Sequence, residues 1–338
     1  MSGSAAVSSE SPSGEERIIA RYFQPLARHP GAFGLTDDAA ILTPPPGYDV
    51  VLKADAIIGS VHFFVDDPAD AVARKALRVN LSDLAAKGAE PAGFLLSLAL
   101  PEGIDEDWLG AFASGLKADA EAYGCPLMGG DTDKTPGPAV ISIAAFGLVP
   151  HGTMVRRKGA RAGDAVVVTG TIGDAALGLR LKRQPDLATR WGLAPRLREH
   201  LAARYLLPDP RNAIAVPLRA HASAAMDVSD GLAGDLGKLC RASVIAAGIA
   251  VARVPLSEAA AAAVAAEPEL IETVLTGGDD YEVLCTMAPD KVASFRAAAA
   301  ATGVTATEIG RVTEGEGARF LDANGRPLTF ARTSYSHF

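Results

Sequence analysis

The sequence predicts a two-domain protein of mixed helices and strands, and three observations lead to this. Its 338 residues exceed what one ordinary hydrophobic core holds. Apolar residues make up 49% and charged residues 21%, a balance typical of a folded globular chain. Segments with helical spacing of apolar residues alternate with short apolar runs that read as strands. Turn-forming residues and a basic run around residue 150 mark the domain boundary, which gives a tail of residues 1–14 and domains of residues 15–150 and 151–338.

Composition also argues against several classes of protein. The formal net charge of −8 argues against a general nucleic-acid binder. No run of about 18 apolar residues could span a membrane. The three cysteines (Cys125, Cys240 and Cys285) lie far apart without metal-ligand spacing, which suits a reducing cytoplasm. Residues 1–14 lack the basic start and apolar core of a signal peptide, so we expect a disordered tail. We therefore expect a cytoplasmic protein with neither nucleic-acid nor membrane partners.

Apolar periodicity indicates the elements of the first half. It predicts helices over residues 15–28, 68–89 and 105–123, and strands over 48–58, 94–100 and 140–148. In the helix 68–89, three leucines form a buried stripe, and Asn80, Asp83 and Lys87 form a polar stripe beside it. Two interpretations of the polar stripe stay open, a surface Asp83–Lys87 ion pair or part of a functional site.

Three further positions of the first half admit both a structural and a functional interpretation. Asp55 lies inside the strand 48–58, where an unpaired carboxylate is costly to bury, so it either pairs with Lys53 or has a functional role. His62 follows that strand between apolar neighbours, a setting more typical of a structural histidine. The segment 127–134 contains Gly129 and Gly130 before Asp131, a pattern of a tight turn that presents amides and carboxylates to a ligand, or of a plain hairpin.

The second half contains a glycine-rich turn and two acidic loops. The strand 165–168 leads through the glycine-rich residues 169–178 into a helix, and such a turn can receive phosphate at the helix N-terminus. The spacing fits neither the dinucleotide fingerprint nor the Walker lysine loop, so a simple tight connection is equally suitable. Another strand ends at Asp227, and Ser229 and Asp230 precede a helix over 231–242. Helix capping explains only one of these three polar side chains. An alanine-rich helix over 258–267 and a strand at 283–285 follow.

Aspartates recur at element ends or in glycine-flanked turns. If they converge, cations must offset their mutual repulsion. All-oxygen ligands without Cys or His indicate a hard ion, and Mg²⁺ with phosphate oxygens is the usual case. A basic side chain, Arg157 or Lys134, would meet the phosphate. No Ser-His-Asp order, activated cysteine or zinc motif competes with this interpretation. The aspartates are Asp38, Asp55, Asp83, Asp131, Asp227 and Asp230.

Six motifs follow one another between Glu15 and Phe338. They are Asp37-Asp38-Ala39-Ala40, Asp55 with His62-Phe63, Asn80 to Ala86, Gly129 to Thr132, Asp227 to Leu232, and Gly277 to Glu282. Together they resemble the thiamine-monophosphate kinase family of the aminoimidazole-ribonucleotide-synthetase-like ATP-binding superfamily. The resemblance implies an α+β fold of two domains, with an N-terminal sheet that forms a homodimer and a C-terminal α/β sandwich. Active sites would lie between the domains and across the dimer.

The resemblance also implies the reaction and its residues. Mg²⁺ ions would assist in-line transfer of the ATP γ-phosphoryl group to thiamine monophosphate, which gives thiamine diphosphate. No general base is expected, because the acceptor phosphate is already ionised. The six aspartates would hold Mg²⁺. Gly130, Arg157 and Ser229 would contact ATP, whereas His62, Asp279 and Tyr335 would contact thiamine monophosphate. A tail anchor packed beside Phe338 is the alternative for Tyr335.

Several positions depart from the pattern of the family. Thr36 stands in place of a glycine, Ala54 in place of a hydroxyl residue, and Asp133-Lys134 in place of Thr-Arg. Asp279 is one methylene shorter than the usual glutamate. These changes concern the reach of single contacts and leave the aspartate framework intact.

Three other functions fit the same set of residues and motifs. The first is a Mg²⁺-dependent phosphatase that acts without ATP, and the second is a regulatory protein that binds nucleotide or cations. The third is another ATP-using member of the superfamily. Selenophosphate synthetase would need a reactive cysteine near its N-terminal glycine-rich segment, and this sequence has no cysteine before Cys125. Hydrogenase-maturation relatives end in a cysteine-bearing tail, whereas this chain ends Tyr335-Ser336-His337-Phe338.

Overall fold

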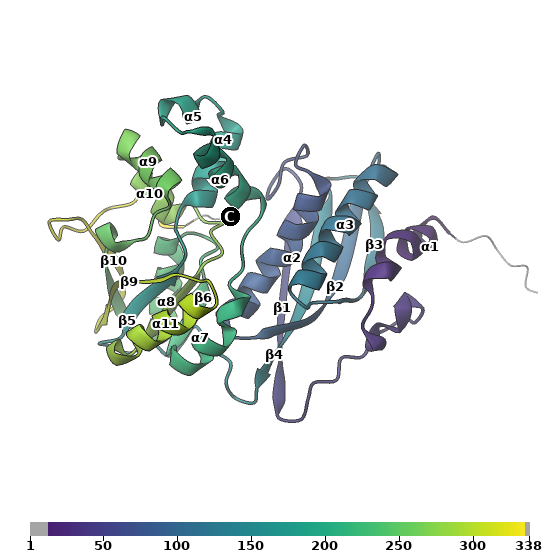
Figure 1. Cartoon of the computed structure of the whole chain (residues 1–338), viewed down its shortest axis with the longest axis horizontal. Coiled ribbons are helices and arrows are strands. Elements are labelled where there is room, and N and C mark those ends of the chain that lie inside the picture. Colours follow the sequence, from purple (N-terminus) through teal and green to yellow (C-terminus); the bar gives the residue numbers. More distant parts are fainter. Residues whose placement is uncertain (1–12, 335–338) are drawn as a thin grey trace, which may run out of the picture.

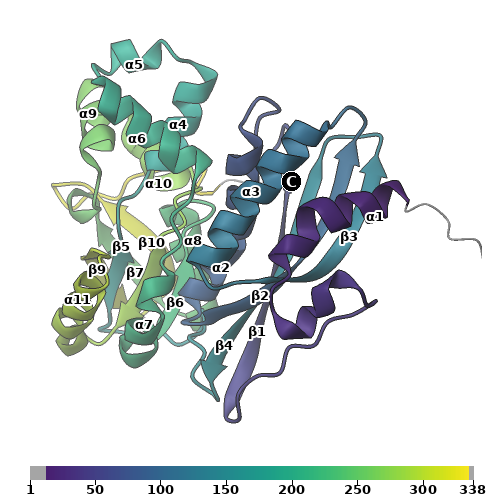
Figure 2. The same ribbon diagram turned by 45° about the vertical axis from the view of Figure 1, so that its right-hand side comes forward.

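The computed structural model describes residues 13–334, which form two parts, each built on one sheet (Figure 1). The first sheet has four strands, and α2 (Ala69–Ala86) and α3 (Glu106–Ala122) cover one of its faces (Figure 2). The strand pairs β1/β4 and β4/β2 are antiparallel, and β2/β3 is parallel. The predicted strands and the helices near 68–89 and 105–123 are therefore confirmed. The strand order is β1 (Tyr48–Ile58), β4 (Val140–Pro150), β2 (Glu90–Pro101), β3 (Leu127–Thr135).

The two faces of the first sheet differ because side chains alternate along each strand. Along β1, Val51 and Ile57 are buried under the helices, whereas Leu52 on the other face is 71% exposed. Along β4, Ile141 and Ile143 are buried in the same way. The helix-covered face is thus the hydrophobic core of the first part, and we call the other face the open face.

The predicted helix over 15–28 is wrong as a single helix. It is divided into α1 (Gly14–Ile18), the π-helical η1 (Ile19–Phe23) and the 3₁₀ turn η2 (Gln24–Leu26), and a further 3₁₀ segment η3 (Pro30–Leu35) follows. Pro25 has no backbone N–H to donate, so the regular helix cannot continue through it. Ser13 caps α1, and the helix begins one residue before the predicted domain start.

The predicted turn at Gly129-Gly130 is also wrong, because both glycines lie within strand β3. β3 pairs in parallel with β2, and the register shifts between Phe94 and Leu95 of β2. A Cβ atom on Gly130 would lie 1.8 Å from the carbonyl oxygen of Leu96. The missing side chain therefore serves close approach of two strands at an irregular point of the sheet, not a turn.

The second part is a sandwich around a six-stranded sheet. Along β5, Val166 and Val168 point into one hydrophobic core, and Ala165 and Val167 point into another. Helices cover both faces, so the α/β sandwich is confirmed. The strand order is β10 (Gly317–Leu321), β7 (Ala246–Ala250), β9 (Ala306–Thr313), β5 (Ala165–Thr169), β8 (Val283–Met287), β6 (Ala224–Asp227). The helices are α4 (Asp174–Arg183), α5 (Leu187–Arg190), α6 (Pro195–Leu206), α7 (Ala215–His221), α8 (Leu232–Ser243), α9 (Glu258–Ala266), α10 (Leu270–Thr276) and α11 (Val292–Ala301).

Helix α2 lies at the joint between the two parts (Figure 1). Its residue Ser82 donates a hydrogen bond to Asp227 at 2.9 Å, and Asn212 of the second part donates to the carbonyl of Leu81 at 3.1 Å. The first sheet ends at Pro150 and the second begins at Ala165. The domain boundary near residue 150 remains a prediction. Among the described residues, no helix is long and apolar enough to cross a membrane.

Candidate active site

Four of the six predicted aspartates meet at the joint between the two parts. Asp55 comes from β1, Asp83 from α2, and Asp227 and Asp230 from the end of β6 and the loop after it. The Lys53 ammonium lies between two of them, with its Nζ 3.0 Å from Asp55 Oδ2 and 2.7 Å from Asp83 Oδ2. Asp83 is therefore bound to Lys53, and the predicted pairing of Asp55 with Lys53 also occurs.

The four carboxylates carry more negative charge than their surroundings balance. Burial raises the pKa of Asp55, and the charges of Asp83 and Asp230 raise it further against the opposing effect of Lys53. Asp227 is buried, and burial followed by the charges of Asp83 and Asp235 raises its pKa to about 8. Burial is the larger cause, and the neighbouring carboxylates add to it.

The chemistry of this donor set fits a hard divalent cation. All its donors are carboxylate oxygens, which Mg²⁺ prefers, and the charges of Asp83 and Asp235 contribute to the raised pKa of Asp227, a repulsion that a cation would offset. Over residues 13–334, no three Asp, Glu, His or Cys side chains already surround a single point as metal ligands would. Lys53 instead lies between Asp55 and Asp83. An ion at that position would require the lysine to move aside.

Asp235 is a buried residue of the site that the sequence did not indicate. Its Oδ2 accepts hydrogen bonds from the backbone N–H groups of Ser229 at 3.0 Å and Asp230 at 2.9 Å. Its Oδ1 lies 2.7 Å from Lys238 Nζ, and that ammonium also pairs with Asp230. Asp235 thereby fixes the loop that carries Ser229 and Asp230. Its place in the first turn of α8, where a carboxylate can bond the amides before a helix, was the available signal.

Backbone hydrogen bonds join two loops that are about fifty residues apart in the chain. We call residues 227–230 and 277–282 the paired loops. Asp279 N–H donates to the carbonyl of Ser229, and Tyr281 N–H donates to that of Val228, both at 2.8 Å. Gly278 has a φ of +78°, and a Cβ there would lie 2.4 Å from the Ser229 oxygen, so this position requires glycine. These two backbone hydrogen bonds place Asp279 next to Ser229.

His62 and Asp279, the two substrate residues predicted within the described range, meet through a lysine that the sequence did not single out. Lys75 of α2 donates from Nζ to Asp279 Oδ2 at 3.2 Å and to the His62 carbonyl at 3.1 Å. His62 Nδ1 accepts from Ile58 N–H at 2.9 Å, so the neutral ring carries its proton on Nε2. Tyr335 lies outside the described residues.

The basic residues near the aspartates occupy separate positions. Lys87 donates from Nζ to the carbonyl of Ala225 at 2.8 Å, so it binds the second part while Asp83 binds Lys53. Burial lowers the pKa of Lys87, and the nearby charge of Arg157 also lowers it. Arg157 is exposed. The structure therefore places the predicted ATP contact Arg157 within electrostatic range of Lys87, on the second part of the chain.

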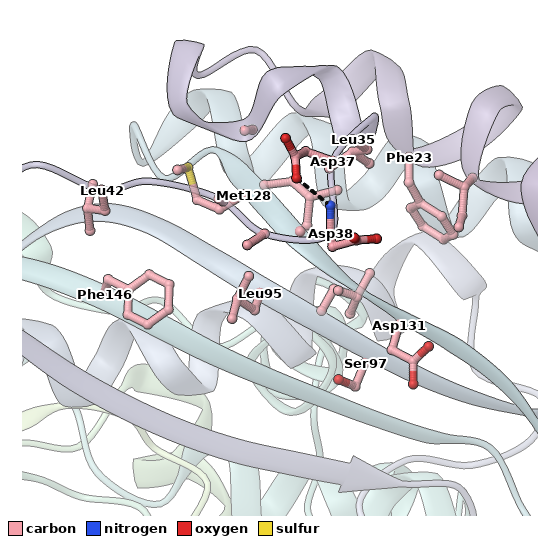
Figure 3. A pocket seen from close by; sticks show the side chains of 18 of the residues that line it. Phe23, Leu35, Asp37, Asp38, Leu42, Leu95, Ser97, Met128, Asp131 and Phe146 are labelled. Atoms are coloured by element: carbon pink, nitrogen blue, oxygen red, sulfur yellow. Dashed lines mark hydrogen bonds between the residues drawn. The ribbon is translucent and has the colours of Figure 1, made fainter.

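Asp38 and Asp131 lie apart from the other four aspartates. Both line a cavity of about 860 Å³ between the open face and the segment 37–42 (Figure 3). Gly130, the third predicted ATP contact, lines the same cavity. Asp131 stands opposite Ser97 in the register of β3 and β2, and both side chains are exposed on the open face.

The sheet register gives the separation of the two acidic groups. Asp55 shares a cross-strand row with Ile143, Leu96 and Gly130, which spans the four strands from one edge to the other. Three strand spacings amount to roughly 14 Å. Asp55 lies on the helix-covered face, because Ile143 and Leu96 of its row are buried there, whereas Asp131 lies on the open face. One chain thus brings together four of the six aspartates.

Comparison with protein families agrees with this architecture. Residues 36–149 match the family described as AIR synthase related protein, N-terminal domain, and residues 161–322 match its C-terminal domain. The two matches, with carboxylates where the domains meet, define the chain as an AIR synthase-related protein. Similarity over almost the whole length narrows the class further. The chain is 42% identical over 337 residues to thiamine-monophosphate kinase of Caulobacter vibrioides, which covers 98% of this chain and 93% of that protein.

The Escherichia coli thiamine-monophosphate kinase is 40% identical over 331 residues, with 96% of this chain and 98% of that protein covered. Among solved structures, the thiamine-monophosphate kinase of Stenotrophomonas maltophilia has a TM-score of 0.81 at 39% identity, covering 92% of this chain and 96% of that one. AaThiL complexed with AMPPCP and TMP has a TM-score of 0.77 at 31% identity, covering 91% and 97%. The chain belongs to the thiamine-monophosphate kinase family.

Proposed function

We propose that this protein transfers the γ-phosphoryl group of ATP to thiamine monophosphate and forms thiamine diphosphate. The single observation that carries the proposal is the convergence of Asp55, Asp83, Asp227 and Asp230 beside Ser229 and Asp279 on the paired loops. A cluster of carboxylates, a nucleotide contact and a substrate contact then share one site. The family relationship and the AMPPCP and TMP complex of AaThiL support the same reaction.

The four clustered aspartates would hold Mg²⁺, which when bound supplies positive charge for the phosphate oxygens. Ser229 and Arg157 would bind the nucleotide from the second part of the chain. Asp235 keeps the Ser229 loop in place through its two backbone hydrogen bonds. No residue needs to remove a proton from the acceptor, because a phosphate oxygen is already ionised at neutral pH. The residues of this chain therefore act by binding and orientation.

Asp279 and His62 would contact thiamine monophosphate from opposite sides of the joint. We retain Tyr335 as a third contact, because an aromatic ring attracts the cationic thiazolium ring through its quadrupole. Two of these side chains are held in fixed positions, His62 by Ile58 and Asp279 by Lys75.

A turnover assay tests the proposed function against two of its three alternatives, the phosphatase and the regulatory protein. With ATP, Mg²⁺ and thiamine monophosphate, we expect thiamine diphosphate and ADP in equal amounts, and no product when ATP is left out. Phosphate release from thiamine monophosphate without ATP would indicate the phosphatase. ATP binding in calorimetry without turnover would indicate a regulatory protein. Either result would overturn the proposal.

We propose further that the protein is a homodimer that associates through the open faces of its first sheets. Leu52, Val50 and Leu95 are exposed on this face, and an apolar sheet face of this kind is normally covered. The separation of Asp38 and Asp131 from the other aspartates supports the same arrangement. A second copy on the open face could complete a site to which one chain contributes only four aspartates.

The dimer has a direct test in solution. At micromolar concentration, light scattering should give twice the mass of the chain. Leu52→Glu should give monomer, because association would bury an unpaired carboxylate from each copy. Val216→Glu, at an exposed valine of α7 far from the open face, should leave the dimer intact. A monomeric parent protein, or a dimeric Leu52→Glu variant, would contradict this proposal.

We place the protein in the cytoplasm, as its cysteine pattern predicts. All three cysteines are free and buried, and burial raises the pKa of Cys285 to about 12, so they behave as small apolar residues and not as a disulfide framework. Cell fractionation with an antibody would test this location, and recovery outside the cytoplasmic fraction would contradict it.

A further inference from the structure

Lys75 is a buried lysine with contacts in three separate elements. Only 3% of its surface is exposed. Its Nζ lies 3.2 Å from Asp279 Oδ2, 3.1 Å from the His62 carbonyl oxygen and 4.3 Å from the centre of the Tyr205 ring. His62 follows β1 in the first part, whereas Asp279 and Tyr205 belong to the second part. A single ammonium therefore connects the two sides of the joint.

A buried ammonium is costly unless its charge and its N–H groups are satisfied. Here a carboxylate, a carbonyl and an aromatic face surround it, and each is a favourable partner for a cation. The contacts therefore explain how Lys75 can be buried. They do not by themselves explain why a lysine stands here, since an apolar side chain could fill the same space between α2 and α6 at lower cost.

The carboxylate that Lys75 holds stands on a constrained backbone. Asp279 has a φ of +63°, and Tyr281 has a φ of +52°, which are both left-handed values for side chains other than glycine. Hydrogen bonds from the Asp279 and Tyr281 amides to the carbonyls of Ser229 and Val228 fix this backbone. The side chain is fixed separately, because Lys75 Nζ donates to Oδ2, and the Tyr281 hydroxyl donates to Oδ1 at 3.3 Å. The direction of the carboxylate is thus set before any ligand binds.

We infer that Lys75 is a positioning residue for recognition of thiamine monophosphate. It holds Asp279 and the His62 segment, one from each part of the chain, in a fixed relation to each other. Pre-organised contacts lower the cost of binding, because the protein does not have to order them when the ligand arrives. This inference rests on the proposed function, which places Asp279 and His62 in the substrate site. It adds a residue that belongs neither to the proposed nucleotide contacts nor to the four clustered aspartates.

The test compares Lys75→Met with the same substitution at a nearby lysine, Lys182. Methionine fills similar space and removes the charge and the donors. Lys182 is the matched control, because its ammonium lies 5.3 Å from the Phe64 ring and pairs with Asp66 and Asp67 but does not touch Asp279. Steady-state rates are measured with thiamine monophosphate varied at saturating Mg²⁺-ATP, and then with ATP varied. Calorimetry with thiamine monophosphate alone gives its affinity without turnover.

Lys75→Met should raise the KM for thiamine monophosphate about 10-fold to 100-fold, the effect of losing a hydrogen bond to a charged group. The KM for ATP should change less than about twofold. Lys75→Arg should recover part of the loss because it keeps the charge, and Lys182→Met should change neither KM. If Lys75→Met does not fold, Lys75→Gln, which keeps a donor but lacks the charge, should show the same selectivity.

Equal rises in both KM values, or a lower melting temperature with an unchanged KM for thiamine monophosphate, would show that Lys75 is only structural. Failure of the proposed function is distinct, because the parent protein itself would then show no turnover with ATP and thiamine monophosphate. In that case, calorimetry with thiamine monophosphate alone tests the role of Lys75. A Lys75-dependent affinity for thiamine monophosphate would uphold the inference, and an affinity that is absent or independent of Lys75 would overturn it.

Discussion

Replacement of Asp83 by asparagine should reduce turnover at least about 100-fold while the protein stays folded. Asp83 lies at the centre of the acidic cluster, where its Oδ2 is 2.7 Å from Lys53 Nζ and its charge raises the pKa of buried Asp227. Asparagine keeps the shape and one oxygen but removes the negative charge that a divalent cation requires. The rate is measured in the ATP-coupled assay with thiamine monophosphate.

Asp70→Asn is the matched control, since Asp70 is an exposed aspartate in the first turn of the same helix. It should retain near-normal turnover. Loss of the Asp83 charge removes its ion pair with Lys53 as well as its repulsion of Asp227, and these two effects on stability oppose each other, so the metal-free variant should stay folded with a melting temperature close to that of the parent protein. Near-normal activity of Asp83→Asn would remove Asp83 from the site and would leave its pairing with Lys53 as its role.

Replacement of Glu282 by glutamine should lower the free energy of unfolding by about 3–5 kcal/mol, the typical cost of breaking a buried ion pair. The Glu282 side chain is fully buried, and its carboxylate accepts hydrogen bonds from Arg211 Nε at 2.7 Å and Thr169 Oγ1 at 2.7 Å. Arg204 Nη2 also donates to it at 3.1 Å. Glutamine would leave two largely buried guanidinium groups without their shared carboxylate. Urea denaturation measures the difference.

The control for this prediction is Glu308→Gln. Glu308 pairs with the more exposed Arg311 at 3.0 Å and Arg253 at 3.6 Å, and such pairs contribute less than about 1 kcal/mol. The two substitutions have the same chemistry, so a difference between them reports burial. Comparable unfolding curves for Glu282→Gln and Glu308→Gln would show that the buried network does not stabilise the second part.

Regular elements could be predicted from the sequence wherever the spacing of apolar residues follows one period, that of a helix or that of a strand. The stripe of Leu77, Leu81 and Leu84 indicated helix α2, and all three side chains are fully buried. Prediction failed where local signals conflict with distant contacts. Gly129 and Gly130 are typical turn residues, yet both pair with β2 within strand β3, and β2 approaches too closely for a side chain at Gly130.

The site was predictable in its residue types and not in its arrangement. Asp55 and Asp131 were both predicted as metal ligands, yet they lie on opposite edges and opposite faces of one sheet. The strand order β1-β4-β2-β3 causes this separation, and no local pattern encodes that order. Lys75 and Lys53 were missed as site residues for a related reason. A lysine on a helix or strand is ordinary in sequence, and only its partners, Asp279 for Lys75 and Asp83 for Lys53, reveal its role.

The hydrogen bonds between the paired loops restrict how this protein can diverge. Residues 277–282 cannot lengthen or change conformation without moving Ser229 and Val228, which their amides contact. If Ser229 binds the nucleotide as proposed, a descendant with a different phosphate acceptor could not arise by exchanging the 277–282 loop alone, since the nucleotide side would be disturbed in the same step. A change in acceptor preference would have to proceed through side chains on an unchanged backbone, and Asp279, the proposed substrate contact, would be the position open to exchange.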